Sequence, residues 1–179
     1  MDNQRKGIRG RGSTSNPVGR FERLEVVSEA LPPDRVDTQY LRDDSRSIIA
    51  HNDSPDVPFS VSINPYRGCE HGCTYCYART YHEYLGYSAG LDFETRILVK
   101  EQAPRLLRSE LDSPGWAPRV LGISGVTDPY QPIERHLQLT RACLEVLVDF
   151  RNPAALITKN ALVTRDIDLL SELARLVTT

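Results

Sequence analysis

Three short apolar segments, each followed by a polar loop and a helical pattern, constrain the fold of this 179-residue chain more than any other feature. The segments are FSVSI, RVLGISG and AALIT, at residues 59–63, 119–125 and 154–158. Helical patterns occur at residues 77–86, 102–111, 133–150 and 166–176, and a further extended segment is predicted at residues 93–100. Apolar runs of this length indicate buried strands. Their alternation with helices predicts an α/β fold with a parallel sheet and right-handed crossovers.

The loops after the three predicted strands contain most of the residues that could carry chemistry. They are NPYRGCEHGCTYCYAR at residues 64–79, SGVTDPY at residues 124–130 and TKN at residues 158–160. In α/β folds with parallel strands, binding loops lie at the carboxyl ends of the strands. We therefore expect these three loops to lie side by side at one edge of the sheet.

Composition and charge argue against several classes of protein. The formal net charge is −2, whereas a nucleic-acid-binding protein usually has a basic balance. No apolar run approaches the roughly 18 residues that a membrane span needs, and the polar N-terminus lacks the apolar region of a secretory signal. We therefore expect a cytoplasmic protein without membrane association, whose cysteines stay reduced.

Composition also divides the chain into three predicted parts. Residues 1–20 are rich in Gly, Ser and Arg, which predicts a disordered basic tail. Residues 21–57 are expected to form an N-terminal extension, with a short amphipathic piece that stops at Pro32-Pro33. Residues 58–179 contain the alternating strands and helices and are expected to form the core domain.

Cys69, Cys73 and Cys76 form a C-x3-C-x2-C motif, with His71 between the first two cysteines. In a reducing compartment, such close cysteines indicate metal binding rather than disulfide bonds. A structural zinc ion needs four protein ligands, and His71 could be the fourth, although its spacing is tighter than in usual zinc sites. The only other cysteine, Cys143, lies in a predicted helix, where a buried apolar role is expected. Three cysteines without a fourth favour a [4Fe–4S] cluster with one iron open to a non-protein ligand. A structural zinc-binding module is the alternative.

The same motif, with the aromatic Tyr75 just before its third cysteine, resembles the pattern of the radical S-adenosylmethionine (radical SAM) enzymes. The resemblance implies that the three cysteines ligate three irons of a [4Fe–4S] cluster and that S-adenosylmethionine chelates the fourth. Tyr75 would lie beside the adenine. A reductant such as flavodoxin or ferredoxin would then drive cleavage of the cofactor to a 5′-deoxyadenosyl radical, which abstracts hydrogen from a substrate.

The resemblance covers most of residues 45–175. Four segments, at residues 52–79, 82–95, 124–134 and 157–166, are together similar to the uncharacterised bacterial radical SAM group related to spore photoproduct lyase. This similarity implies a parallel-sheet partial (β/α) barrel of the radical SAM type. Only the N-terminal half of such a barrel is expected here, so we expect a C-terminally truncated form. DNA is a candidate substrate by this resemblance, and the catalytic residues are not identified.

Polar residues of the two later loops are candidates for binding the cofactor. Thr127 and Asp128 could hold the amino group of S-adenosylmethionine, and similarity to the lyase family favours Thr127 or its neighbour. Lys159 ends the third predicted strand, where it could pair with the cofactor carboxylate, and the lyase family has a lysine at the matching position. For Asp128, the alternative is a turn in which the carboxylate caps backbone N–H groups. For the whole chain, a further alternative is a fragment that binds a cluster without catalysis.

Overall fold

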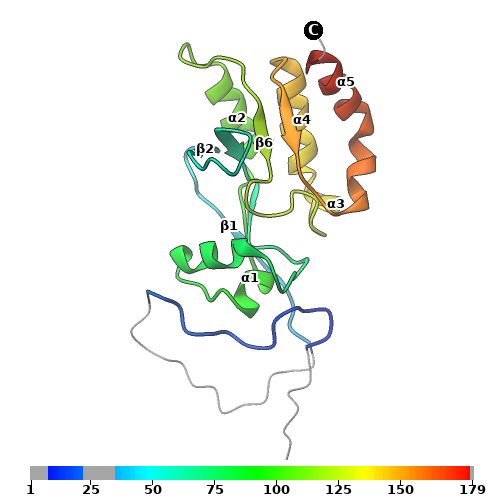
Figure 1. Ribbon diagram of the computed structural model, residues 1–179. Helices are drawn as coiled ribbons and strands as arrows, with labels where there is room; N and C mark the ends of the chain where they lie inside the picture. Colours follow the sequence, from blue (N-terminus) through cyan, green and yellow to red (C-terminus); the bar gives the residue numbers. More distant parts are fainter. Residues whose placement is uncertain (1–7, 22–34, 178–179) are drawn as a thin grey trace, which may run out of the picture. The chain divides into compact units, whose positions relative to one another are not determined.

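The three predicted strands pair with one another in a single sheet (Figure 1). The computed structural model describes residues 8–21 and 35–177, in which these strands are β3 (Val61–Ile63), β6 (Leu121–Ile123) and β7 (Ala154–Leu156). β3 pairs in parallel with β6, and β6 pairs in parallel with β7. The predicted α/β class and the parallel pairing are therefore confirmed.

A fourth strand, β2 (Ile49–His51), extends this sheet in a way that the sequence patterns did not indicate. It pairs antiparallel with β3, with Ile49 opposite Ile63 and His51 opposite Val61. The sheet order is β2-β3-β6-β7, so the sheet is mixed. The strands of the described residues do not close into a barrel, and the partial radical SAM barrel stays a prediction.

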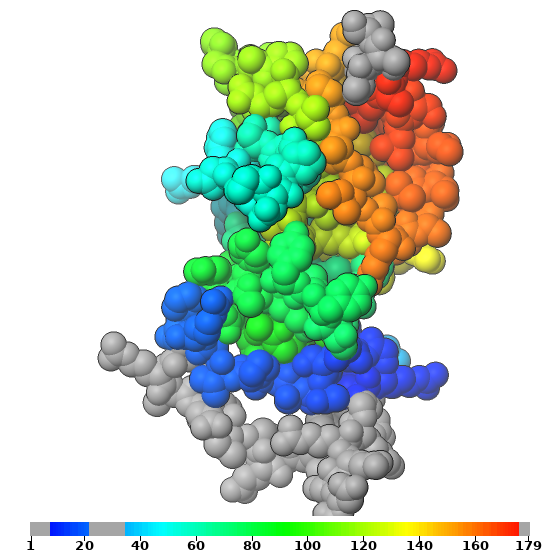
Figure 2. All heavy atoms as spheres, viewed as in Figure 1, coloured from blue at the N-terminus to red at the C-terminus, as the bar shows by residue number. Residues whose placement is uncertain are grey.

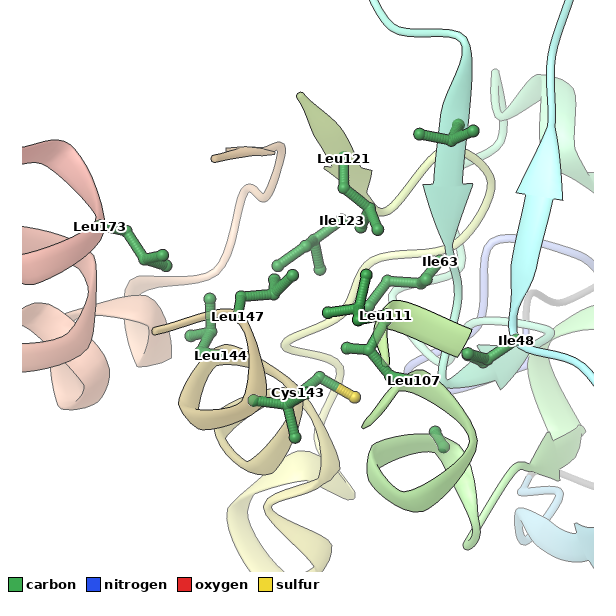
Figure 3. Packing of buried hydrophobic residues seen from close by; sticks show 13 residues of the cluster. Ile48, Ile63, Leu107, Leu111, Leu121, Ile123, Cys143, Leu144, Leu147 and Leu173 are labelled. Carbon is green, nitrogen blue, oxygen red and sulfur yellow. The ribbon is translucent and has the colours of Figure 1, made fainter. Parts of the chain in front are cut away.

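The core of this part of the chain lies between the sheet and three helices: α2 (Ala103–Leu111), α4 (Leu139–Asp149) and α5 (Ile167–Val177). In α2 the buried residues Ala103, Leu107 and Leu111 recur every fourth position, which places them on one face of the helix. Figure 3 shows this packing, in which the labelled side chains are Ile48, Ile63, Leu107, Leu111, Leu121, Ile123, Cys143, Leu144, Leu147 and Leu173. Burial of these side chains is the main favourable contribution to folding.

The helix predicted at residues 133–150 is divided into α3 (Glu134–Leu137) and α4. Gln138 separates them and has a left-handed backbone conformation, with φ of 52°. The Glu134 carboxylate accepts the backbone N–H of Thr140 at 3.1 Å and so occupies the N-terminus of α4. Because the first N–H groups of a helix lack partners within the helix, this side chain stabilises a new helix start. The hydrophobic period continues through the break, so it did not reveal the division.

Contacts divide the chain into two units, and each is described separately. One unit comprises residues 42–66 and 99–179 and contains the mixed sheet. The other comprises residues 1–41 and 67–98, within the described ranges. Most of β1 (Gln39–Arg42), most of β5 (Arg96–Val99) and one of the two residues of β4 (Tyr66–Arg67) belong to this second unit. The three strands form a sheet in the order β1-β5-β4. The atoms of both units are drawn in Figure 2.

The second unit also contains η1, a 3-10 helix (Tyr77–Leu85), and α1 (Leu91–Thr95). The predicted helical stop at Gly86 is confirmed, with φ of 77°. The extended segment predicted at residues 93–100 is correct only for β5, because residues 93–95 are helical. The Asp92 carboxylate accepts the backbone N–H of Ser88 at 3.1 Å, just before α1 begins. This local hydrogen bond favours a turn at the point where the β-branched pattern predicted a strand.

Part of the segment predicted to be a disordered tail is packed against other residues of the second unit. Ile8 is buried, and the Arg11 guanidinium donates to the carbonyl oxygens of Glu94 at 2.9 Å and Val36 at 2.8 Å. Residues 1–7 and the predicted amphipathic piece within residues 22–34 lie outside the described residues.

Candidate functional site

The loop that contains the three cysteines, residues 68–76, follows β3 and β4 and is called the cysteine loop. Two glycines turn its backbone. Gly68 and Gly72 have φ of 82° and 59°, in the left-handed region that favours glycine. The backbone N–H of Cys69 donates to the carbonyl of Phe93 at 2.8 Å, which fixes the start of the loop. Cys69 is buried, whereas Cys73 and Cys76 are half-buried, and none of the three belongs to a disulfide bond.

Three cysteines in one short loop fit, as a donor set, the Cys ligation that iron–sulfur clusters use. Within the described residues, no group of three or more His, Cys, Asp or Glu side chains is gathered closely enough to hold a metal ion. His71, the candidate fourth zinc ligand, is half-buried in the same loop. The cysteines are thus of the chemical type that a cluster needs, and metal binding itself stays a prediction.

A buried ion pair stabilises the cysteine loop from one side. The Arg79 guanidinium pairs with the Glu94 carboxylate at 2.6 Å, and its Nε donates to the carbonyl of Cys73 at 2.9 Å. The same guanidinium also donates to the carbonyl oxygens of Ala89 and Gly90. Glu94 is fully buried. Glu94 was not predicted, because its only signal in the sequence is an acidic residue between Phe93 and the apolar segment of β5.

Tyr75 and the tyrosines of η1 are exposed. The exposed fraction is 84% for Tyr75, 66% for Tyr77 and 67% for Tyr84. The Tyr75 ring is thus available to stack on a ligand, and its predicted contact with an adenine stays a prediction.

A pocket of about 420 Å³ lies beside Glu70 of the cysteine loop. The Glu70 carboxylate accepts hydrogen bonds from Thr38 at 2.7 Å and Tyr40 at 2.8 Å. Arg9 and Arg11 contribute to the lining, so the pocket contains charges of both signs. It therefore lacks the single-sign field that would select a cation or an anion.

At the carboxyl edge of the mixed sheet, hydrogen bonds link the segment after β3 to the loop after β6. Asn64 Oδ1 accepts the backbone N–H groups of Val126 at 3.0 Å and Thr127 at 3.4 Å. Thr127 is buried, and its hydroxyl donates to the carbonyl of Tyr66 at 2.8 Å. The hydroxyl of Thr127, a predicted cofactor contact, is thus directed toward the protein backbone.

Asp128 links the loop after β6 to the loop after β7. One carboxylate oxygen accepts the Thr158 hydroxyl at 2.7 Å and the Tyr130 N–H at 2.9 Å. The other accepts the backbone N–H of Lys159 at 3.1 Å, and Lys159 is exposed. The expected juxtaposition is thus confirmed for the loops after β6 and β7, and the turn with Asp128 bonded to backbone N–H groups is present. The cysteines belong to the other unit.

Tyr66, Tyr130, Glu134 and Asp166 form a buried network with Arg165 that was not predicted from the sequence. Tyr66 donates to Glu134, and Arg165 pairs with both Glu134 at 2.9 Å and Asp166 at 2.7 Å. Tyr130 also donates to Asp166, at 3.0 Å. Burial and the Glu134 charge raise the pKa of Tyr66, so its hydroxyl stays protonated and donates. Burial alone would raise the pKa of Asp166, but hydrogen bonds from Arg165 and Arg141 outweigh it and lower that pKa.

Cys143 does not join the other cysteines. It is fully buried in the core, as expected, and burial raises the pKa of its thiol. A protonated thiol among leucine side chains is a poor metal ligand, because thiolates are the ligating species.

Comparisons with known proteins give relatives that are described only as uncharacterized. Over 121 residues, or 68% of the chain, the sequence is 39% identical to protein Rv2578c of Mycobacterium tuberculosis, of which it covers 36%. The figures for protein Mb2609c of Mycobacterium bovis are the same. Over 107 residues, or 60% of the chain, it is 36% identical to protein MJ0683 of Methanocaldococcus jannaschii, of which it covers 38%.

The chain thus spans 36% to 38% of the length of these curated relatives. No family model and no solved structure matches it. Among the helices of the described residues, none has the length and apolar character needed to cross a membrane.

Proposed function

We propose that this chain binds a [4Fe–4S] cluster through Cys69, Cys73 and Cys76, and that it binds S-adenosylmethionine, as in radical SAM enzymes. The observation that carries the proposal is the C-x3-C-x2-C motif, in the segment that follows β3, a strand that pairs in parallel with β6. The chemistry that the bound group supplies is one-electron cleavage of S-adenosylmethionine, which provides a radical able to take a hydrogen atom from a substrate.

The residues around the motif have separate roles in this proposal. Arg79 and Glu94 hold the backbone of the cysteine loop. Tyr75, with its exposed ring, would stack on the adenine. Asp128 and Lys159, at the sheet edge, would interact with the amino and carboxylate groups of the methionine moiety. A flavodoxin or ferredoxin would supply the electron, and the substrate class is open, with DNA as one candidate.

The proposal is tested by anaerobic purification and reconstitution of the full chain with iron and sulfide. We expect about four irons and four sulfides per chain and a brown chromophore. Reduction in the presence of S-adenosylmethionine should then release 5′-deoxyadenosine. One tightly bound zinc without a chromophore would overturn the proposal and indicate a structural module. A loaded cluster without 5′-deoxyadenosine would leave the metal site correct and overturn the catalytic part.

A further inference from the structure

Tyr66, at the start of the segment that leads into the cysteine loop, is held at both ends by hydrogen bonds. Its carbonyl accepts the Thr127 hydroxyl at 2.8 Å, and its own hydroxyl donates to the Glu134 carboxylate. The side chain of Tyr66 is fully buried. A residue fixed at the backbone and at the tip of its side chain has little freedom to shift or rotate.

Glu134, in turn, is fixed by groups from two helical elements. Its carboxylate accepts the Thr140 N–H at 3.1 Å in the first turn of α4. It also pairs with Arg165 of η2 (Ala161–Asp166) at 2.9 Å, and Arg165 donates to the Glu134 carbonyl at 2.9 Å. Glu134 is fully buried, and Arg165 compensates its negative charge. Glu134, the acceptor of the Tyr66 hydroxyl, is therefore fixed by its bonds to α4 and η2.

Only Arg67 and Gly68 separate Tyr66 from Cys69. Tyr66 thus fixes the chain just before it enters the unit that contains the cysteines. Preorganised supporting residues of this kind keep ligands in a productive geometry.

We infer that Thr127, Tyr66 and Glu134 form a clamp that positions the start of the cysteine loop, a role that rests on the proposed function. Thr127 acts here through the backbone of Tyr66 instead of touching the cofactor. Glu134 acts through the Tyr66 hydroxyl. None of the three residues is a metal ligand or a catalytic residue in this assignment.

The test must separate positioning from simple stabilisation, because any buried hydrogen bond stabilises a fold. The variants are Tyr66→Phe, Thr127→Val and Glu134→Gln in the full chain. Thr127→Ser is the rescue variant, because it keeps the hydroxyl. The matched control is Trp116→Phe, which removes the hydrogen bond from Trp116 Nε1 to Asn152 at 3.0 Å. Asn152 precedes β7, so this control acts at the amino edge of the sheet.

The reduced, reconstituted chain is titrated with S-adenosylmethionine, and the electron paramagnetic resonance spectrum of the cluster monitors binding. All proteins are measured at a temperature where circular dichroism shows each variant folded. We expect the midpoint concentration to rise about tenfold in Tyr66→Phe, Thr127→Val and Glu134→Gln, as for other supporting residues of metal sites. Thr127→Ser and Trp116→Phe should change it less than twofold.

Loss of the cluster from the three clamp variants, with retention in Trp116→Phe, would also support the inference. Midpoints within twofold of the parent chain for all three clamp variants would overturn it and leave a structural role. If the parent chain itself takes up no iron, the proposed function fails, which is distinct from a failure of the clamp.

Discussion

The Arg79 guanidinium lies 2.6 Å from the fully buried carboxylate of Glu94 and also donates to the carbonyl of Cys73 at 2.9 Å. One side chain thus compensates a buried charge and fixes the backbone at the second cysteine of the motif. Glu94 has a second partner, the backbone N–H of Gly12 at 2.9 Å. The ion pair therefore links the N-terminal segment, the cysteine loop and α1.

Replacement of Arg79 by leucine should strongly destabilise the fold. The Glu94 charge would stay buried without its cation, and breaking such a pair costs about 3 kcal/mol or more in the free energy of unfolding. Urea denaturation followed by circular dichroism measures this change. In the double variant Arg79→Leu/Glu94→Gln the loss should be clearly smaller than the sum of the two single losses. Additive losses would show that the two side chains are not coupled.

Single replacements of Cys69, Cys73 and Cys76 by alanine should each lower the iron content of the reconstituted chain well below that of the parent. Each replacement removes one of the three thiols on which cluster ligation depends. Cys143→Ala is the matched control, because the Cys143 thiol is fully buried in the core with a raised pKa. Iron content per folded chain is the measurement. Equal iron loss in Cys143→Ala would contradict the assignment of ligands.

His82 should make the fold less stable in mild acid. Burial lowers the pKa of His82 to about 4, with the Asp92 charge opposing, whereas an unfolded histidine has a pKa of about 6.5. Between these values the unfolded chain binds more protons. Stability should therefore fall as pH drops from 6.5 to 4, by up to about 3 kcal/mol. Below pH 4 the folded state is protonated as well, and this contribution levels off.

Urea unfolding between pH 4 and pH 7 tests the role of His82, with His82→Gln as the non-titrating variant. Because the variant lacks the titrating imidazole, the slope of its unfolding free energy against pH should correspond to about one proton fewer in this window. Asp168, whose pKa is lowered to about 2 by Arg141, acts in a lower window: its stabilisation is present above the unfolded pKa of about 3.9 and disappears as pH falls toward 2. For His82, an unchanged slope of the unfolding free energy between pH 4 and pH 6.5 in His82→Gln would contradict the prediction.

A methyl group at Gly122 of β6 should destabilise the mixed sheet. A Cβ atom there would lie 2.5 Å from the ring of Phe59, so the ring or the strand must shift. We expect Gly122→Ala to cost about 1–3 kcal/mol, as overpacking of a core usually does. Thermal unfolding is the measurement, and Phe59→Leu should restore part of the loss. Gly115→Ala is the control, because nothing lies within 4 Å of that position.

Periodicity and strand length in the sequence predicted β3, β6 and β7, because buried parallel strands are continuous apolar runs. The same logic placed the loops after β6 and β7 side by side at the carboxyl edge, where Asp128 of the first loop accepts hydrogen bonds from Thr158 and Lys159 of the second. β2 was not predicted, because its three residues carry no alternating pattern and its pairing with β3 is its main support. The break at Gln138 depends on the Glu134 side chain, and a hydrophobic pattern contains no information on such a cap.

The sequence by itself determined the α/β class, the cysteine motif and the chemical class of its donors, because apolar periods and thiol spacing are local properties of the chain. Only the tertiary structure decided which charges are buried together. Glu94 meets Arg79, and Glu134 meets Tyr66 and Arg165, across long separations in sequence. Each of these acidic residues resembles an ordinary surface residue in the linear sequence. Burial beside a specific partner, which depends on packing of distant segments, gives it a structural role.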